Sequence, residues 1–110
     1  MRRVIVESPF AGDVERNTVY ARACLRDCLL RGEAPFASHL LYTQVGILND
    51  KIPDDRKLGM EAGFAWGLVA ETTVVYIDYG ISNGMAAGIK RAEEAGRLVE
   101  YRKLHTFKVE

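Results

Sequence analysis

The sequence has little cysteine, no net charge and no long hydrophobic run, and each of these absences excludes a class of protein. Two cysteines are too few for a disulfide framework, which favours a reducing compartment and a cytoplasmic location. Fifteen basic and fifteen acidic side chains cancel, so no overall field draws the chain to polymeric nucleic acid or to an anionic membrane. The longest largely apolar run, residues 64–70, is far too short to cross a bilayer, and the N-terminus lacks the apolar stretch of a signal peptide.

Cys24 and Cys28 are four residues apart in a helical pattern, so they share one face of a helix. Unoxidised cysteines on such a face behave as small apolar core groups. The alternative, a Cys-x3-Cys metal or redox pair, lacks a histidine or a third cysteine nearby. Because no two candidate ligands have a recognisable spacing, the sequence implies no metal and no other cofactor.

What the chain does have is a series of short apolar strands that alternate with helices. Its length of 110 residues, with 48% hydrophobic and 27% charged side chains, is typical of one globular domain, here residues 1–110. We predict strands at residues 4–6, 35–37, 72–77 and 98–101, and helices at residues 14–31, 53–70 and 83–95. This alternation predicts an α/β fold with a parallel sheet covered on both faces. Residues 42–53 form a long loop, and residues 105–110 are either an edge strand or an arm.

The predicted helix that begins at Pro53 is apolar on nearly all sides. Between Leu58 and Ala70 its one charged residue is Glu61. A helix of this kind is buried on more than one side. In so small a domain, we expect the second buried side to contact another copy of the chain, in a homodimer or larger homo-oligomer.

Three segments follow predicted strands and should meet at the edge where open parallel sheets bind ligands. The first is residues 8–13 with Asn17, which either braces this loop or contacts a ligand. The second, residues 80–85, joins two glycines to a helix N-terminus; it suits a phosphate or ribose oxygen, or its glycines only permit close packing. The third, residues 35–42, contains His39, an acid–base candidate. The candidate ligand-binding residues are Ser8, Pro9, Phe10, Gly12, Asn17, His39, Gly80, Ser82, Gly84 and Met85.

Two carboxylates, Asp78 and Glu61, are candidates for catalysis. Asp78 ends the central strand, where catalytic carboxylates often lie, although turns also favour aspartate. Glu61 is either a solvated charge or an acid that reaches a subunit boundary. Asp54 and Asp55 are explained as residues at a helix start. The catalytic candidates are therefore Asp78, Glu61 and His39.

Taken together, these segments resemble the nucleoside 2-deoxyribosyltransferase-like superfamily, especially its small bacterial and phage members. The matching stretches are residues 6–13 (Val-Glu-Ser-Pro-Phe-Ala-Gly-Asp), 35–42 (Pro-Phe-Ala-Ser-His-Leu-Leu-Tyr), 54–60 and 80–85 (Gly-Ile-Ser-Asn-Gly-Met). Each stretch is short, so the specificity comes from their order and spacing over residues 3–101. The resemblance implies a Rossmann-like, flavodoxin-type three-layer sandwich with a short parallel sheet of four to five strands.

The resemblance also implies a nucleoside or nucleotide as the small-molecule partner. Active members cleave the N-glycosidic bond with a glutamate near the start of the helix after the third strand, through a covalent deoxyribosyl intermediate. That position falls on Gly88, which has no side chain to attack the sugar. Two hypotheses stay open. One is a deoxyribosyltransferase-like or N-glycosidase-like enzyme whose carboxylate is Asp78 or Glu61. The other is a non-catalytic module of the same fold that binds a nucleotide-like metabolite or a protein.

Overall fold

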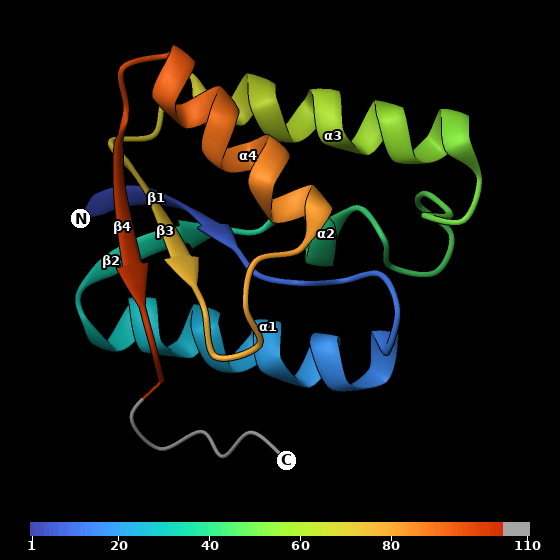
Figure 1. Cartoon of the computed structure of the whole chain (residues 1–110), viewed down its shortest axis with the longest axis horizontal. Coiled ribbons are helices and arrows are strands. Elements are labelled where there is room, and N and C mark those ends of the chain that lie inside the picture. Colours follow the sequence, from blue (N-terminus) through green and yellow to red (C-terminus); the bar gives the residue numbers. More distant parts are fainter. Residues whose placement is uncertain (105–110) are drawn as a thin grey trace.

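A four-stranded parallel sheet forms the centre of the computed structural model, which describes residues 1–104 (Figure 1). Its strands are β1 (Arg2–Glu7), β2 (Glu33–Phe36), β3 (Thr72–Tyr76) and β4 (Leu98–Arg102). Each pair of neighbouring strands is parallel. The predicted α/β fold with a short parallel sheet is confirmed. The edge strand or arm predicted at residues 105–110 lies outside the described residues.

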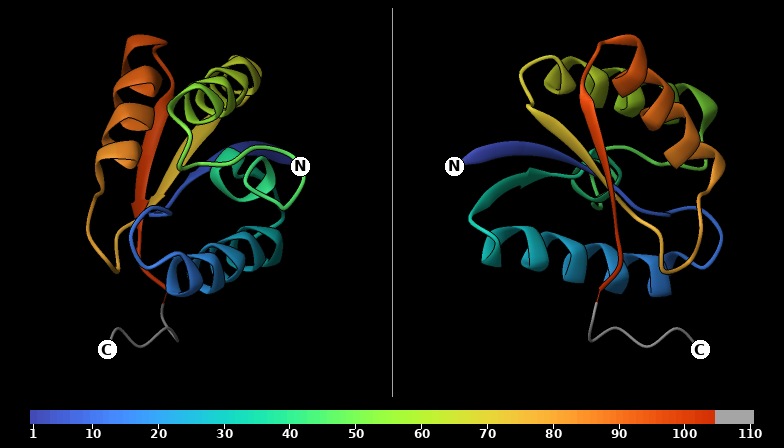
Figure 2. Two further views of the ribbon diagram at one scale, coloured as in Figure 1. Left: turned by 90° about the vertical axis from the view of Figure 1, so that its right-hand side faces the viewer. Right: turned by 60° about the vertical axis from the view of Figure 1, so that its left-hand side comes forward.

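The strand order β2-β1-β3-β4 makes the sheet doubly wound, as in flavodoxin-like folds. The chain leaves β1 through α1 (Val14–Leu30) and reaches β2 at one edge. It then crosses back over β1 through α3 (Pro53–Gly67) and continues through α4 (Asn83–Glu94) to the other edge. Because the direction reverses, α1 covers one face of the sheet, and α3 and α4 cover the other (Figure 2). The point of reversal lies between β1 and β3.

The face under α1 holds the larger apolar core. Val4 and Val6 of β1 and Val74 and Tyr76 of β3 pack there against α1. The buried stripe of α1 consists of Asn17, Tyr20, Ala21, Cys24 and Cys28. Both cysteines are free and buried, as expected for core groups.

The helix boundaries follow most of the predicted signals. Asp13 caps α1, because its side chain accepts a hydrogen bond from the Arg16 N–H in the first turn. In contrast, α3 ends at Gly67 rather than near Ala70, and Arg97 donates to the Gly67 carbonyl at 2.7 Å. A short helix, α2 (Ser38–Leu41), was not predicted, since four residues carry no periodic signal. Among the described residues, no helix is long and apolar enough to cross a membrane.

Within this chain α3 is less buried than its apolar sequence predicts. Its buried residues are Gly63 and Gly67, whereas Leu58 and Trp66 are 57% and 55% exposed. Leu68, directly after the helix, is exposed as well. Residues 1–104 therefore do not supply the second buried side of this helix, and the homo-oligomer that would cover it stays a prediction.

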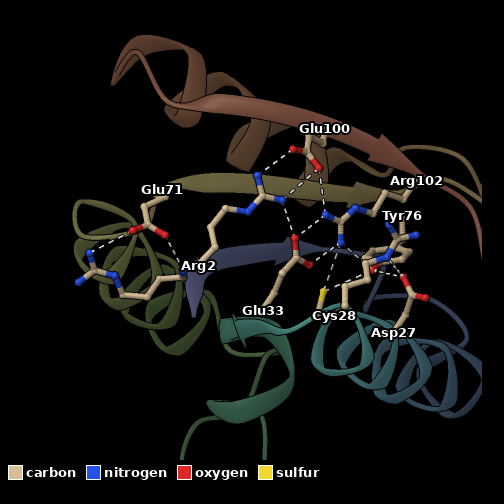
Figure 3. Close-up of polar contacts among 10 residues, drawn as sticks. Arg2, Asp27, Cys28, Glu33, Glu71, Tyr76, Glu100 and Arg102 are labelled. Atoms are coloured by element: carbon tan, nitrogen blue, oxygen red, sulfur yellow. Dashed lines mark hydrogen bonds and ion pairs between the residues drawn. The ribbon is translucent and has the colours of Figure 1, made fainter.

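Beside α1, a network of charged side chains crosses the sheet from β2 to β4 (Figure 3). Arg102 donates to both carboxylate oxygens of Glu33 at 2.7 Å, and to Glu100 at 2.9 Å. Arg2 bridges the same two glutamates, at 2.5 Å and 3.0 Å. Glu33 and Arg102 each expose only 7% of their side chains. The network therefore pairs the charges that this face buries, and it ties β1, β2 and β4 together.

Candidate functional site

A pocket of about 320 Å³ lies between the sheet and the α3–α4 layer, at the carboxyl end of β1. Residues of β1, α2, α3 and the first half of α4 line it. Its aromatic walls are formed by Phe10, Phe36, Tyr42 and Phe64. This place, beside the point where the winding reverses, is where doubly wound sheets bind ligands.

Glycines on both helices leave the space for this pocket. Gly59 and Gly63 of α3 and Gly84 and Gly88 of α4 line it. Residues four apart lie on the same face of a helix, so each pair faces the pocket together. Gly63 leaves room for Ser38 of α2, and Gly88 leaves room for Glu7 of β1, since a Cβ added at either position would lie within 3 Å of that side chain.

Ser8 and His39 form a hydrogen-bonded pair in the pocket wall. Ser8 Oγ lies 2.7 Å from Nε2 of His39. Burial lowers the pKa of His39 to about 4, so its ring is neutral near pH 7. His39 is held by α2, which packs tightly on α3: a Cβ added to Gly63 would lie 2.6 Å from Ser38 Oγ. Both residues were predicted as ligand contacts, and the structure brings them together.

The loop from Ser8 to Asp13 is braced by Asn17. Its Nδ2 donates to the carbonyl oxygens of Phe10 (3.0 Å) and Ala11 (3.2 Å), and its Oδ1 accepts from Arg16. Of the two roles that the sequence left open for Asn17, the geometry favours the bracing role. Phe10 lines the pocket, whereas Pro9 is buried outside the lining and Gly12 lines a neighbouring hollow.

The N-terminus of α4 forms the opposite wall. Ser82 caps the helix: its Oγ accepts a hydrogen bond from the Met85 N–H at 3.3 Å, and Met85 Sδ accepts one from the Ser82 N–H at 3.4 Å. Ser82, Gly84 and Met85 line the pocket together with Asn83. Gly80 lies in the preceding turn, outside the lining, where its φ of 80° requires a left-handed backbone.

The structure brings neither Asp78 nor Glu61 to this pocket. Asp78 Oδ2 accepts a hydrogen bond from the Tyr20 hydroxyl at 2.5 Å, and its carboxylate also accepts from the Leu104 N–H. It thus connects β3 to α1 and to the end of β4, on the other side of the sheet. Glu61 is exposed on α3, 3.9 Å from the Lys57 ammonium. Their catalytic roles remain predictions from sequence, and this chain's geometry supplies no contact that would carry them.

Glu7, the last residue of β1, does line the pocket, and the sequence analysis missed it. Its side chain points at α4: a Cβ added to Gly88 would lie 2.8 Å from Oε1 and would overlap Oε2 and Cδ. Burial raises the pKa of Glu7 to about 8, and the Arg97 guanidinium opposes the shift. The sequence feature that could have identified Glu7 is an acidic residue directly after the apolar run of residues 4–6.

The fold defines a doubly wound α/β domain of flavodoxin-like topology with a pocket beside its switch point. The model of a family described as a domain of unknown function, DUF7768, matches residues 2–102, and the chain belongs to this family.

Among solved structures, the chain is similar to a 2-deoxyribosyltransferase from the psychrotolerant bacterium Bacillus psychrosaccharolyticus. The TM-score is 0.63 at 17% sequence identity, over 98% of this chain and 77% of that one. At this identity the likeness concerns the fold, and at that level it supports the resemblance seen in the sequence. No curated protein matches the chain.

Proposed function

We propose that the pocket binds a nucleoside or nucleotide, for cleavage or transfer at its N-glycosidic bond. The observation that carries the proposal is the pocket itself, about 320 Å³ at the carboxyl end of β1, with aromatic and polar groups on its walls. Pockets of this size hold drug-sized ligands and use few polar groups to orient them. The fold likeness to a 2-deoxyribosyltransferase supports the same class of ligand.

The aromatic wall suits a nucleobase. Phe36 lies between Tyr42 and Trp66, with ring centroids 6.0 Å and 5.8 Å away. Phe36 and Tyr42 line the pocket and offer flat apolar faces against which a base can stack.

The polar walls suit a sugar and its phosphate. Ser8 and His39 together offer hydroxyl and imidazole partners for sugar hydroxyls. Ser82 and Asn83 lie at the N-terminus of α4, where the helix dipole favours an anion. Arg56 of α3 also lines the pocket, next to Gly84; its guanidinium is paired with Asp50 at 3.0 Å and has further N–H groups to offer a ligand oxygen.

Binding is tested by calorimetry and thermal denaturation with each deoxynucleoside and each deoxynucleoside 5′-monophosphate. We expect at least one compound to raise the melting temperature, since a ligand that binds only the folded state stabilises it. Ser8→Ala should weaken that binding by about fivefold, the loss of one hydrogen bond. Tyr101→Ala, an exposed substitution on β4, is the control and should leave it unchanged. If no compound shifts the melting temperature or gives binding heat, the proposal is wrong.

A non-catalytic binding module is the second candidate. It is favoured by Gly88, which has no side chain, and by the positions of Asp78 and Glu61 outside the pocket lining. Chromatography distinguishes the two candidates: the module binds a nucleoside and leaves it intact, whereas the enzyme releases free base.

We also propose that α3 joins two copies of the chain and that the protein is cytoplasmic. Leu58, Trp66 and Leu68 expose the apolar surface for such a contact, and the free cysteines fit a reducing compartment. Sedimentation of the wild type should give a dimer or larger species, and Leu58→Glu should give monomer; a monomeric wild type would refute the oligomer.

A further inference from the structure

We infer that Glu7 is the catalytic acid of this pocket, which protonates the departing base as the N-glycosidic bond of a bound nucleoside breaks. The inference rests on the proposed function and names the residue that performs its chemistry. It assigns the reacting carboxyl to Glu7, at the end of β1, instead of to Asp78 or Glu61.

Glu7 lies at the place in the sheet where ligands bind. Glu7 is the residue with which β1 ends, and it pairs in register with Val75 of β3, so it lies at the switch point. Ile5, two residues earlier on the same face of the strand, lines the pocket as well. Glu7 therefore carries its carboxyl into the space between the sheet and α4, at the edge where ligands enter.

Helix α4 leaves room for the Glu7 carboxyl at one position. An added Cβ at Gly88 would overlap the Glu7 carboxyl, whereas one at Gly84, a turn earlier on the same helix, would meet only Arg56 Nη2 at 3.6 Å. Gly88 is thus the position at which α4 must lack a side chain for Glu7 to lie where it does. The helix therefore lacks a side chain at the place where the strand supplies a carboxyl.

The Glu7 carboxyl has no hydrogen-bond partner within residues 1–104, although its side chain is only partly exposed. Arg97, the cation whose charge opposes the raised pKa of Glu7, donates instead to Thr73 Oγ1 (2.9 Å) and to the Gly67 carbonyl (2.7 Å). A carboxyl that the protein does not use for its own bonding is available to a ligand.

The other carboxylates of the pocket lining are occupied. Asp50 pairs with Arg56 at 3.0 Å, and Asp55 accepts the Asn49 N–H at 2.8 Å. The remaining titratable or charged groups around the pocket are His39, Tyr42, Arg56 and Arg97. His39 is neutral near pH 7 because burial lowers its pKa to about 4. Glu7, with its pKa raised to about 8, is the lining acid that holds a proton at neutral pH.

The chemistry balances with water as the second reactant. Glu7 transfers its proton to a ring nitrogen of the base while the bond from C1′ to the base breaks, and the base keeps the electron pair of that bond. The sugar is left as an oxocarbenium ion. Water adds to C1′, and the proton it loses returns to the Glu7 carboxylate. One nucleoside and one water give one free base and one sugar.

The test measures binding and base release separately, on wild type, Glu7→Gln, Glu7→Asp and Glu71→Gln. The ligands are the deoxynucleosides and their 5′-monophosphates; calorimetry gives Kd and chromatography gives the rate of base release. Glu71 is an exposed residue outside the pocket, so Glu71→Gln is the matched control and should behave as wild type. Glu7→Gln keeps the shape of the side chain and removes the acid.

We expect Glu7→Gln to lose about 10²–10⁴-fold in rate, the usual contribution of a general acid, with Kd changed less than about threefold. Glu7→Asp keeps an acid but withdraws it by one methylene group, so its rate should lie between those of Glu7→Gln and wild type. The wild-type rate should also fall as the pH rises through about 8, where Glu7 loses its proton.

Three results would overturn the inference. The first is base release by Glu7→Gln at the wild-type rate. The second is a wild type that binds a nucleoside and releases no base from any compound, which leaves the binding proposal standing. The third is the absence of binding by every compound, which overturns the proposed function together with this inference. If Glu7→Gln does not fold, the Glu7→Asp rate decides, and a wild-type rate in that variant counts against Glu7.

Discussion

Glu7 and Glu33 are glutamates on neighbouring strands, and they meet opposite environments on the two faces of one sheet. Glu33 accepts hydrogen bonds from Arg102 and Arg2, and these bonds lower its pKa to about 2. The Glu7 side chain makes no hydrogen bond within the described part of the chain, and burial raises its pKa to about 8. The same side chain is thus held as a charge on the α1 face and as a neutral acid on the α3–α4 face.

The difference separates a structural role from a functional one. A buried charge with two guanidinium partners lies in a site that the fold has completed, and no ligand is needed to satisfy it. A carboxyl that lies in a pocket and makes no hydrogen bond to the described residues is available to a ligand. Groups left in that state are candidates for chemistry. Substitutions of Glu33 and of Glu7 should therefore have different consequences.

Glu33→Gln should have the largest effect on stability. It leaves Arg2 and Arg102 without their shared carboxylate, and Arg102 is nearly fully buried. We expect a loss of about 3 kcal/mol in the free energy of unfolding by urea, at the low end of the range for a broken buried pair because Glu100 stays in contact with both arginines. The control, Glu71→Gln, breaks an exposed pair with Arg3 and should change stability far less. Equal losses in the two variants would contradict the structural role of Glu33.

Glu7→Gln should change how stability depends on pH. The folded pKa of about 8 lies above the ordinary value of 4.5, so between these values the folded state holds a proton that the unfolded state has lost. Wild-type stability should therefore fall as the pH rises toward 8, by at most about 1.4 kcal/mol per pH unit, and level off above it. Glu7→Gln lacks this contribution, so it should become the more stable of the two at high pH.

The difference in stability between wild type and Glu7→Gln reports the titration of Glu7 alone. His39 acts in the opposite direction, because its lowered pKa means that stability is lost as the pH falls from about 6.5 toward 4. Glu33 adds a further loss as the pH falls from 4.5 toward about 2. Both contributions are the same in wild type and Glu7→Gln and cancel in the difference. Parallel stability curves from pH 6 to 9 would mean that Glu7 is not held neutral.

These two glutamates also show how far the sequence could be interpreted. The strands, the helices and the strand-end position of Ser8 and His39 follow from local patterns, namely β-branched runs, caps and glycine stops. The partners of Glu7 and Glu33 do not, because Gly88 and Arg102 lie 81 and 69 residues further along the chain. Only the packing of α4 on β1 shows that a glycine on one element makes room for an acid on another. Similarly, the sequence alone did not show that the Asp78 carboxylate accepts a hydrogen bond from the Tyr20 hydroxyl.

Gly88→Ala should test that packing directly. The new methyl group overlaps the Glu7 carboxyl, which must move aside. We expect a loss of about 1 kcal/mol, at the low end for overpacking because the obstacle is the end of a flexible side chain. Gly84→Ala is the matched control: it has only an ordinary contact, and alanine in a helix should stabilise it by about 0.5–1 kcal/mol. In a Glu7→Ala background Gly88→Ala should lose most of its penalty, and an unchanged penalty there would mean that another group opposes the methyl.

Glu61→Gln, a substitution outside the pocket, should have the smallest effect. Glu61 lies on the exposed side of α3, with 60% of its side chain exposed and Lys57 as a distant partner. Exposed pairs of this kind contribute little, so unfolding by urea should give the wild-type midpoint within error. Base release should also match wild type, since the acid we assign is Glu7. A large loss of base release with normal stability would mean that α3 delivers Glu61 to the pocket of a second copy of the chain, and the reacting carboxyl would then have to be assigned across that contact.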